Sequence, residues 1–422
     1  MNFYDFNKYK QSDRDGSYGG NSGFKEGVLI NDEYWIIKYP KKGTNLKDVQ
    51  NMSYTTHPVS EYIGSHIYEI LGFDVHKTCL GIKNEHLVVA CKDFLAENQK
   101  LLEFRQLKNT YNKQLNEKLD LSLSPTGSEH FVNLNEILIH LDYNPSINSI
   151  PGIKKRFWDC VIVDGFINNN DRNNGNWGII RSKMNKDVLA PIFDNGASFS
   201  PNVPEYKIIH KLNNQEALIQ SACSCITAYS LDGENNVLFR DILNLDNEEL
   251  CNSIKRNVPL IKEKFSEIEQ TIEDIPFSMG DYSIISKERK REYKQELEVR
   301  LNNLLIPAYE RVLRLQKEQD KSDSNNLSDF MSFGDKYISQ VLEYSKSMSV
   351  KDATHKTHEE LVFSTPDEKD IKQKKLNTYL QLKGVNSNAD FAKYISELKT
   401  RKIDLSKENK HLTSKDDDFG IS

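Results

Sequence analysis

The sequence predicts a two-lobed α+β fold, with a small β-rich N-terminal lobe, a larger helical C-terminal lobe and an additional helical region after it. Three observations lead to this prediction. Short runs of strand type gather in the first 96 residues, apolar stripes at helical spacing dominate residues 210–316, and the composition turns polar from Lys317 onwards. We therefore expect three parts, which are residues 1–96, 97–316 and 317–422.

The overall composition excludes several classes of protein. Of the 422 residues 37% are hydrophobic, and no apolar run approaches the roughly 18 residues that a membrane helix needs. The N-terminus lacks the basic start and apolar stretch of a secretory signal. A net charge of −6 gives no general attraction to nucleic acid, and the six cysteines form no C-x-x-C pair of the zinc-binding type. We expect a cytoplasmic protein with reduced thiols, no membrane span and no direct contact with nucleic acid.

A glycine-rich segment opens the predicted N-terminal lobe. Four glycines occur within nine residues, and a β-hairpin follows with a two-residue turn at Asn31 and Asp32. Backbone N–H groups in such a loop can turn toward one anion, as phosphate-binding loops require, although the same composition suits a flexible segment. The candidate nucleotide-binding residues of this loop are Gly20, Ser22, Gly23, Phe24 and Lys25.

Two charged residues follow the loop in the order that a phosphate-binding site would need. Lys38 ends the apolar strand Trp35-Ile36-Ile37, where it could clamp a phosphate or simply reach solvent. A helix is predicted from Pro58 to Leu71, and Glu61 near its start could either complement the helix dipole or orient Lys38 by an ion pair. Two further strands, predicted over 73–80 and 86–91, lead to Lys92-Asp93-Phe94, a candidate hinge between the lobes.

Two polar loops at the ends of neighbouring strands carry the strongest chemical signal. An apolar helix predicted over 153–167 leads to Asp171, which is followed five positions later by Asn176, and a second loop holds Asp194 in Phe193-Asp194-Asn195-Gly196. Phosphoryl transfer needs a carboxylate to accept the proton of the nucleophile, and an amide oxygen and a second carboxylate to hold magnesium. The spacing therefore indicates Asp171, Asn176 and Lys38 as catalytic residues, with Asn176 and Asp194 as metal ligands.

The C-terminal third is predicted to be a polar linker followed by helices. Residues 317–330 contain few apolar anchors, and amphipathic segments follow at 335–348, 366–383 and 388–400. The middle segment has a capping box from Thr365 to Glu368. The apolar stripes of the three segments must pack on the rest of the chain or on a partner. The last residues, from Lys407 onwards, are predicted to be disordered.

Taken together, the glycine-rich loop, Lys38, Glu61, the hinge and the two acidic loops resemble the HipA-like serine/threonine kinases. N-N-D-R-N-N-G-N-W-G and P-I-F-D-N-G carry this resemblance, which extends over roughly residues 17–310 and points to a short branch without the extra N-terminal subdomain of the HipA toxins. The resemblance implies a bilobal protein-kinase-like fold, ATP and magnesium as cofactors, and a protein substrate with a serine or threonine acceptor.

The resemblance also assigns roles and leaves questions. It makes Asp171 the base, Asn176 and Asp194 the metal ligands, and Lys38 the phosphate clamp, and it implies a bacterial toxin or effector kinase that phosphorylates itself. Ser17 and Ser22 match the family's loop serines only loosely. Asn173 stands where the HipA toxins usually carry histidine, and the added tail leaves open whether an antitoxin or another partner binds. Two other functions stay compatible with these residues, a regulatory nucleotide-binding scaffold and a kinase of a small molecule or lipid.

Overall fold

The computed structural model describes residues 3–12, 25–42, 55–125, 132–182, 186–363 and 368–413. The predicted loop residues Gly20, Ser22, Gly23 and Phe24, and the predicted capping residue Thr365, lie outside these ranges. The chain divides into a first unit, residues 1–313, and a second unit, residues 314–422. The predicted boundaries at 96/97 and 316/317 stay predictions.

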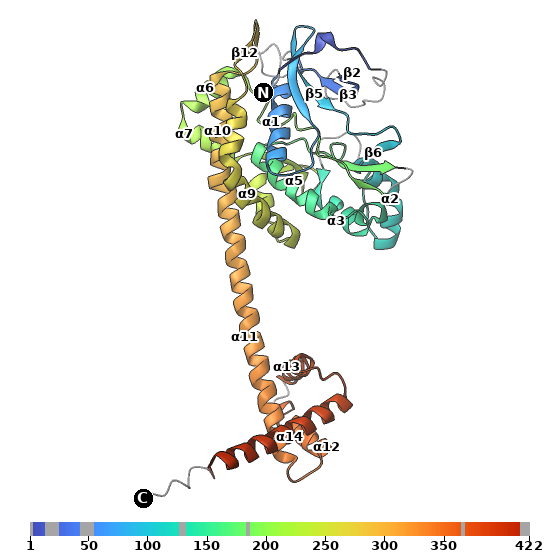
Figure 1. The fold of residues 1–422 in the computed structure, drawn as a ribbon, viewed down its shortest axis with the longest axis vertical. Coiled ribbons are helices and arrows are strands. Elements are labelled where there is room, and N and C mark those ends of the chain that lie inside the picture. The colour runs from blue at the N-terminus through green and yellow to red at the C-terminus, as the bar shows by residue number, and fades with distance from the viewer. Residues whose placement is uncertain are drawn as a thin grey trace, which may run out of the picture. The chain divides into compact units, whose positions relative to one another are not determined.

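A five-stranded sheet forms the N-terminal part of the first unit, with strand order β1-β4-β5-β3-β2 (Figure 1). Strands β2 and β3 form a hairpin in which Asn31 and Asp32 both have positive φ, at 52° and 64°, because a tight two-residue turn that follows the twist of the strands requires this conformation. The strands are β1 (Tyr4–Asp5), β2 (Lys25–Ile30), β3 (Glu33–Lys38), β4 (Thr78–Lys83) and β5 (His86–Lys92).

Helix α1 (His57–Ile70) packs against this sheet and carries one of the predicted site residues (Figure 1). Pro58 stands in its first turn, where the missing N–H leaves no bond unmade. Val59, Ile63 and Ile67 are fully buried on the side of the helix that faces the core, together with Leu80 and Val89 of the sheet. This packing fixes the position of Glu61 relative to the end of β3.

The larger part of the first unit is helical and is built around α5 (Ile153–Ile167), which is buried on nearly all sides. Small sheets and hairpins border it, formed by β6 (Gln99–Glu103), β8 (Gly178–Ser182) and β9 (Val188–Leu189); by β7 (Val132–Asn133), β10 (Ile226–Ser230) and β11 (Asn236–Leu238); and by β12 (Ser278–Met279) and β13 (Tyr282–Ser283). The helices around it are α2 (Phe104–Leu119), α3 (Leu134–Tyr143), α4 (Pro145–Asn148), α6 (Glu205–Leu212), α7 (Gln215–Cys223), α8 (Phe239–Leu243), α9 (Glu248–Glu273) and α10 (Lys287–Arg300). The predicted α+β class with a helical second lobe is observed.

The second unit has a hydrophobic core of its own. Tyr337, Val341, Leu376, Tyr379 and Ile395 are among its buried residues. Four helices contribute to it, which are α11 (Ile306–Tyr344), α12 (Val350–Leu361), α13 (Lys369–Leu382) and α14 (Asn388–Thr413). The stripes predicted from sequence at 335–348, 366–383 and 388–400 fall largely on α11, α13 and α14, whereas α12 was not predicted.

Two segments of the C-terminal third differ from the sequence prediction. Residues 317–330, expected to be a linker, lie within α11, and α14 extends into the segment expected to be disordered from Lys407. Residues 317–330 are mostly Asp, Ser and Asn, which are poorer helix formers than Lys and Glu, so intrinsic propensity does not explain the helix there. Extending an existing helix is easier than starting one, so the helical segments on both sides can continue through this polar stretch.

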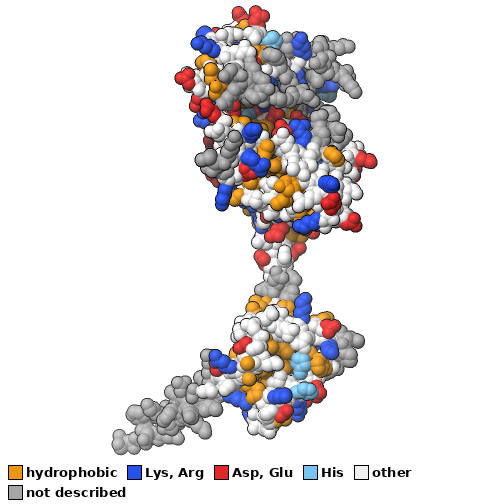
Figure 2. All heavy atoms as spheres, turned by 90° about the vertical axis from the view of Figure 1, so that its right-hand side faces the viewer, with side chains coloured by type: hydrophobic (Ala, Val, Ile, Leu, Met, Phe, Trp, Pro, Cys, Tyr) orange, Lys and Arg blue, Asp and Glu red, His pale blue; other side chains and the backbone are white. Residues whose placement is uncertain are grey.

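The part of the chain that the structure describes has no helix of membrane-spanning type and carries charges of both signs on its surface. None of its helices combines the length and the apolarity needed to cross a bilayer. On the face drawn in Figure 2, basic and acidic side chains are interspersed over both units. This mixture agrees with the modest net charge of −6.

Candidate active site

Three charged residues from distant parts of the chain meet at the end of strand β3. Lys38 Nζ lies 2.8 Å from Glu61 Oε2 and 2.9 Å from Asp194 Oδ1. Lys38 ends β3, Glu61 lies on α1, and Asp194 follows the short run after β9. The ion pair between Glu61 and Lys38, one of the two interpretations that the sequence left open, is therefore present, and its role in catalysis stays a prediction.

The electrostatics of this cluster keep all three groups charged. Burial alone would lower the pKa of Lys38, but the carboxylates of Asp194 and Glu61 raise it well above its ordinary value. Burial would raise the pKa of Glu61 and that of Asp194, but the Lys38 ammonium holds both below their usual range. The cluster thus presents one cation between two carboxylates at neutral pH.

Asp171 lies on the loop that follows α5, with its side chain open to solvent. One of its carboxylate oxygens, Oδ1, accepts a hydrogen bond of 2.9 Å from Asn173 Nδ2, and its backbone N–H donates to Asn169 Oδ1. Protein around the carboxylate displaces part of its hydration, and this desolvation, with the nearby charge of Asp194, raises the pKa of Asp171 above its ordinary value. A raised pKa makes a carboxylate a better proton acceptor.

Asn176 stands on the same loop and is tied to Asp171 through the backbone. Its side-chain Nδ2 donates to the backbone carbonyl of Asp171, so that this bond leaves the amide oxygen of Asn176 available. Amide and carboxylate oxygens are the ligands that Mg²⁺ prefers. The donor set of Asn176 and Asp194 therefore fits a magnesium ion, as the sequence predicts.

A buried ion pair, which the sequence analysis missed, anchors the loop of Asp171. Arg172 donates from Nε to Asp164 Oδ2 at 2.8 Å and from NH2 to Asp164 Oδ1 at 2.9 Å, and both side chains are almost completely buried. Arg172 also donates to the backbone carbonyls of Asn176 and Phe193. The guanidinium thus joins helix α5 to two loops, the loop of Asp171 and Asn176 (the predicted catalytic loop, called the catalytic loop below) and the loop of Asp194 (the predicted metal loop, called the metal loop below). Asp164, a carboxylate in the most apolar part of the 153–167 run, was the sequence signal that could have indicated this ion pair.

The remaining predicted site residues lie near the ends of β2 and β5. Lys25 stands opposite Lys38 in the β2–β3 register, and its charge contributes to the low pKa of Asp194. Lys92 pairs with Glu33 at 2.6 Å, away from the charged cluster, whereas the Phe94 ring lies 5.7 Å from the ring of Phe193 beside the metal loop. Asp93 accepts a hydrogen bond from the backbone N–H of Leu95. Lys25 and Phe94 therefore lie beside Lys38 and Phe193 respectively, whereas the Lys92 ammonium is paired with Glu33.

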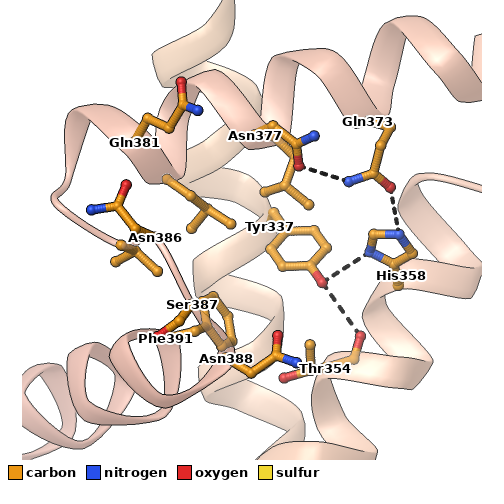
Figure 3. Close-up of a pocket in the computed structure, with 13 residues that line it drawn as sticks. Tyr337, Thr354, His358, Gln373, Asn377, Gln381, Asn386, Ser387, Asn388 and Phe391 are labelled. Carbon is orange, nitrogen blue, oxygen red and sulfur yellow. Dashed lines mark hydrogen bonds between the residues drawn. The ribbon is translucent and has the colours of Figure 1, made fainter.

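A separate pocket of about 390 Å³ lies in the second unit (Figure 3). His358 bridges Tyr337 and Gln373 there, at 3.2 Å from the Tyr337 hydroxyl and 2.8 Å from Gln373 Oε1. Its lining contains no Lys, Arg, Asp or Glu side chain. This pocket therefore lacks the charged groups that phosphate transfer requires, and the candidate active site is the one in the first unit.

Comparisons with known proteins place these features in context. No family model matches the chain. The chain is 30% identical over 313 residues to the serine/threonine-protein kinase CtkA of Helicobacter pylori strain J99, covering 73% of this chain and 88% of that protein. The crystal structure of the Helicobacter pylori proinflammatory kinase CtkA superposes with a TM-score of 0.63 at 28% identity, covering 74% of this chain and all of that one. A complex of Shewanella oneidensis HipA, HipB and operator DNA gives a TM-score of 0.40 at 12% identity, covering 69% and 68% of the two chains.

Proposed function

The chain belongs to the family of CtkA-type serine/threonine-protein kinases and has their two-lobed fold, and from this premise we propose that it transfers the terminal phosphate of ATP to a serine or threonine hydroxyl of a protein, with magnesium as the metal. The observation that carries the proposal is the contact of Lys38 with both Glu61 and Asp194. Asp194 in turn lies near enough to Asp171 for its charge to act on that carboxylate, and Asp171 and Asn176 are joined by a hydrogen bond.

Asp171 is the proposed general base. Its carboxylate is open to solvent, so that a substrate hydroxyl can reach it, and its raised pKa favours proton acceptance. A positioned base contributes roughly 10² to 10⁴ in rate. Asn173 and Asn169 hold the loop in place by hydrogen bonds to Asp171.

Asn176 and Asp194 are the proposed magnesium ligands, and Lys38 is the proposed phosphate clamp. Bound magnesium supplies positive charge that offsets the charge of the transferring phosphate. Lys38 adds a second positive charge, which Glu61 keeps oriented from the side of α1. Lys25 and Phe94 are proposed to contribute to the nucleotide pocket. In support, Lys25 stands opposite Lys38 in the β2–β3 register, and the Phe94 ring contacts the ring of Phe193.

The test is intact-mass analysis of the purified protein after incubation with magnesium and ATP, alone and with a generic protein substrate. We expect added mass in steps of one phosphate on the protein itself or on the substrate, and almost none with Asp171→Ala or Asp194→Ala. Asp241→Ala, which removes an exposed carboxylate on α8, is the matched control and should behave like the unmodified protein.

Two other results would contradict the proposal. Binding of ATP without any phosphate transfer, in all samples, would indicate a regulatory nucleotide-binding protein. Phosphate transfer only to a sugar or lipid offered in the same assay would indicate a small-molecule or lipid kinase.

A further inference from the structure

The side chain of Asn195, next to the proposed metal ligand Asp194, is fully buried between helix α1 and the catalytic loop. Its backbone N–H donates to Glu61 Oε1 at 2.9 Å, and its side-chain Nδ2 donates to Ser65 Oγ at 3.0 Å. Its Oδ1 accepts a bond of 2.6 Å from Arg172. One residue therefore contacts α1 twice and the catalytic loop once.

His76 extends these contacts from the other side. Its Nε2 lies 3.0 Å from Glu61 Oε1 and 3.1 Å from Ser65 Oγ, and both His76 and Ser65 are buried. The backbone N–H of His76 donates to the carbonyl of Ile192, just ahead of the metal loop. The carboxylate of Glu61 is thus held by three partners, which are Lys38, Asn195 and His76.

The backbone of α1 comes unusually close to this loop. A Cβ added at Gly64 would lie 3.0 Å from the Cβ of Asn195 and 3.1 Å from Ser198 Oγ, which is tighter than ordinary packing. The absence of a side chain at Gly64 therefore lets helix and loop approach. The short distance makes the bonds of Asn195 to Glu61 and Ser65 geometrically possible.

We propose that Asn195 is a positioning residue that holds helix α1 against the metal loop and the catalytic loop. Its bonds to Glu61, Ser65 and Arg172, called the lock below, keep Lys38, Glu61 and Asp194 assembled before any ligand binds. This inference rests on the proposed kinase function. Buried hydrogen bonds in a low-dielectric interior are strong and directional, so the lock resists rotation of α1. A displacement of about 1 Å at a reacting centre can cost about 10²-fold in rate.

The first experiment compares the full-length protein with Asn195→Ala. We expect kcat to fall by about 10²-fold while KM for ATP changes far less, because every side chain proposed to contact the nucleotide is retained and only the alignment of these side chains changes. Without nucleotide, hydrogen exchange of the amides in residues 192–199 should accelerate.

Asn257→Ala is the matched control. Asn257 is also buried, and its Nδ2 donates to Asp159 at 2.8 Å and to Ser253, on α9. We expect it to lower Tm to a similar degree without a change in kcat or in exchange at 192–199. If Asn195→Ala does not fold, Ser65→Ala serves in the same comparison, because it removes the Ser65 contacts to Asn195 and His76 but leaves the bonds of Asn195 to Glu61 and Arg172 in place.

Unchanged kcat and unchanged exchange in Asn195→Ala, or an equal loss of kcat in Asn257→Ala, would overturn the inference. The exchange measurement needs no ATP, so it reports on the lock even if the unmodified protein transfers no phosphate. An inactive protein with accelerated exchange in Asn195→Ala would thus contradict the kinase proposal and support the lock.

Discussion

Lys38 Nζ lies 2.9 Å from Asp194 Oδ1, although the two residues are 156 positions apart in the sequence. The contact joins the end of a strand in the small lobe to the loop that would hold the metal. It is present together with the Lys38–Glu61 ion pair, so one ammonium joins the end of β3, helix α1 and the loop of Asp194.

Removing this ammonium should make stability depend on pH in a new way. In the folded protein Lys38 keeps the pKa of Glu61 and that of Asp194 below their ordinary values, so these carboxylates add stability above about pH 4 and lose it as pH falls through their folded-state pKa. In Lys38→Met, burial would instead raise both pKa values, and two uncompensated carboxylates would destabilise the fold at pH 7. We expect a large Tm difference from the unmodified protein near pH 7 that narrows toward about pH 4.

Thermal unfolding at several pH values measures this difference. Lys154→Met, which removes a half-exposed lysine paired with Asp142, is the control and should show a small difference. A Tm difference for Lys38→Met that is constant across this pH range would mean that the Lys38 charge does not hold the two carboxylates ionised.

Asn173→Ala should move the acid limb of the pH–rate profile to higher pH. The hydrogen bond from Asn173 lowers the pKa of Asp171, while desolvation and the Asp194 charge raise it. Without that bond the pKa of Asp171 rises further, and the ionised base is lost at a higher pH as the solution is acidified. Profiles of kcat/KM against pH would show the shift, and Asn244→Ala, which changes an exposed asparagine of the α8 cap, should leave the limb in place. An acid limb that does not move would argue against Asp171 as the titrating base.

Arg172→Met should destabilise the first unit by about 3–5 kcal/mol, because it leaves the buried carboxylate of Asp164 without its charge partner. Arg181→Met breaks a pair with Asp187 that is partly exposed, and it should cost less than about 1 kcal/mol. Denaturant unfolding measures both values. Equal costs for the two variants would show that burial of the Arg172 pair has no energetic consequence.

Gly334→Ala should disrupt the second unit alone. A Cβ at position 334 would lie 2.0 Å from the ring of Tyr379, which is impossible without moving α11 or α13. Hydrogen exchange over α13 should accelerate, whereas Lys336→Ala, at an exposed position two residues later, should change little. All three tryptophans, at 35, 158 and 177, belong to the first unit, so the thermal transition followed by tryptophan fluorescence should be preserved. Loss of that transition as well would mean that the first unit depends on the second.

The parts of the site that the sequence could predict are those with a local signal. Lys38 follows an apolar strand, Asp171 and Asn176 have a fixed spacing, and Asp194 ends another apolar run. Each of these signals lies within about six residues. The fold class followed in the same way from strand and helix periodicity.

The residues that sequence reasoning missed are connected only in three dimensions. Asn195 and Ser65 are 130 positions apart, and no pattern within either segment points to the other. His76 lies in the segment 73–80 that was predicted to be a strand, but β4 begins only at Thr78, and His76 stands in the irregular segment before it. Residues 317–330 were predicted to be a linker because they lack apolar anchors, but they lie within α11, where a helix formed on either side can be extended through a polar stretch.

The pairing of Asp164 with Arg172 has a consequence for how this protein can change over generations. Replacing either residue alone leaves a buried charge without its partner, so a change at one position destabilises the protein unless the other position changes as well. We expect the two positions to be kept together or exchanged together among relatives, even though neither touches the reacting atoms. A survey of many relatives would therefore show these two positions varying as a pair.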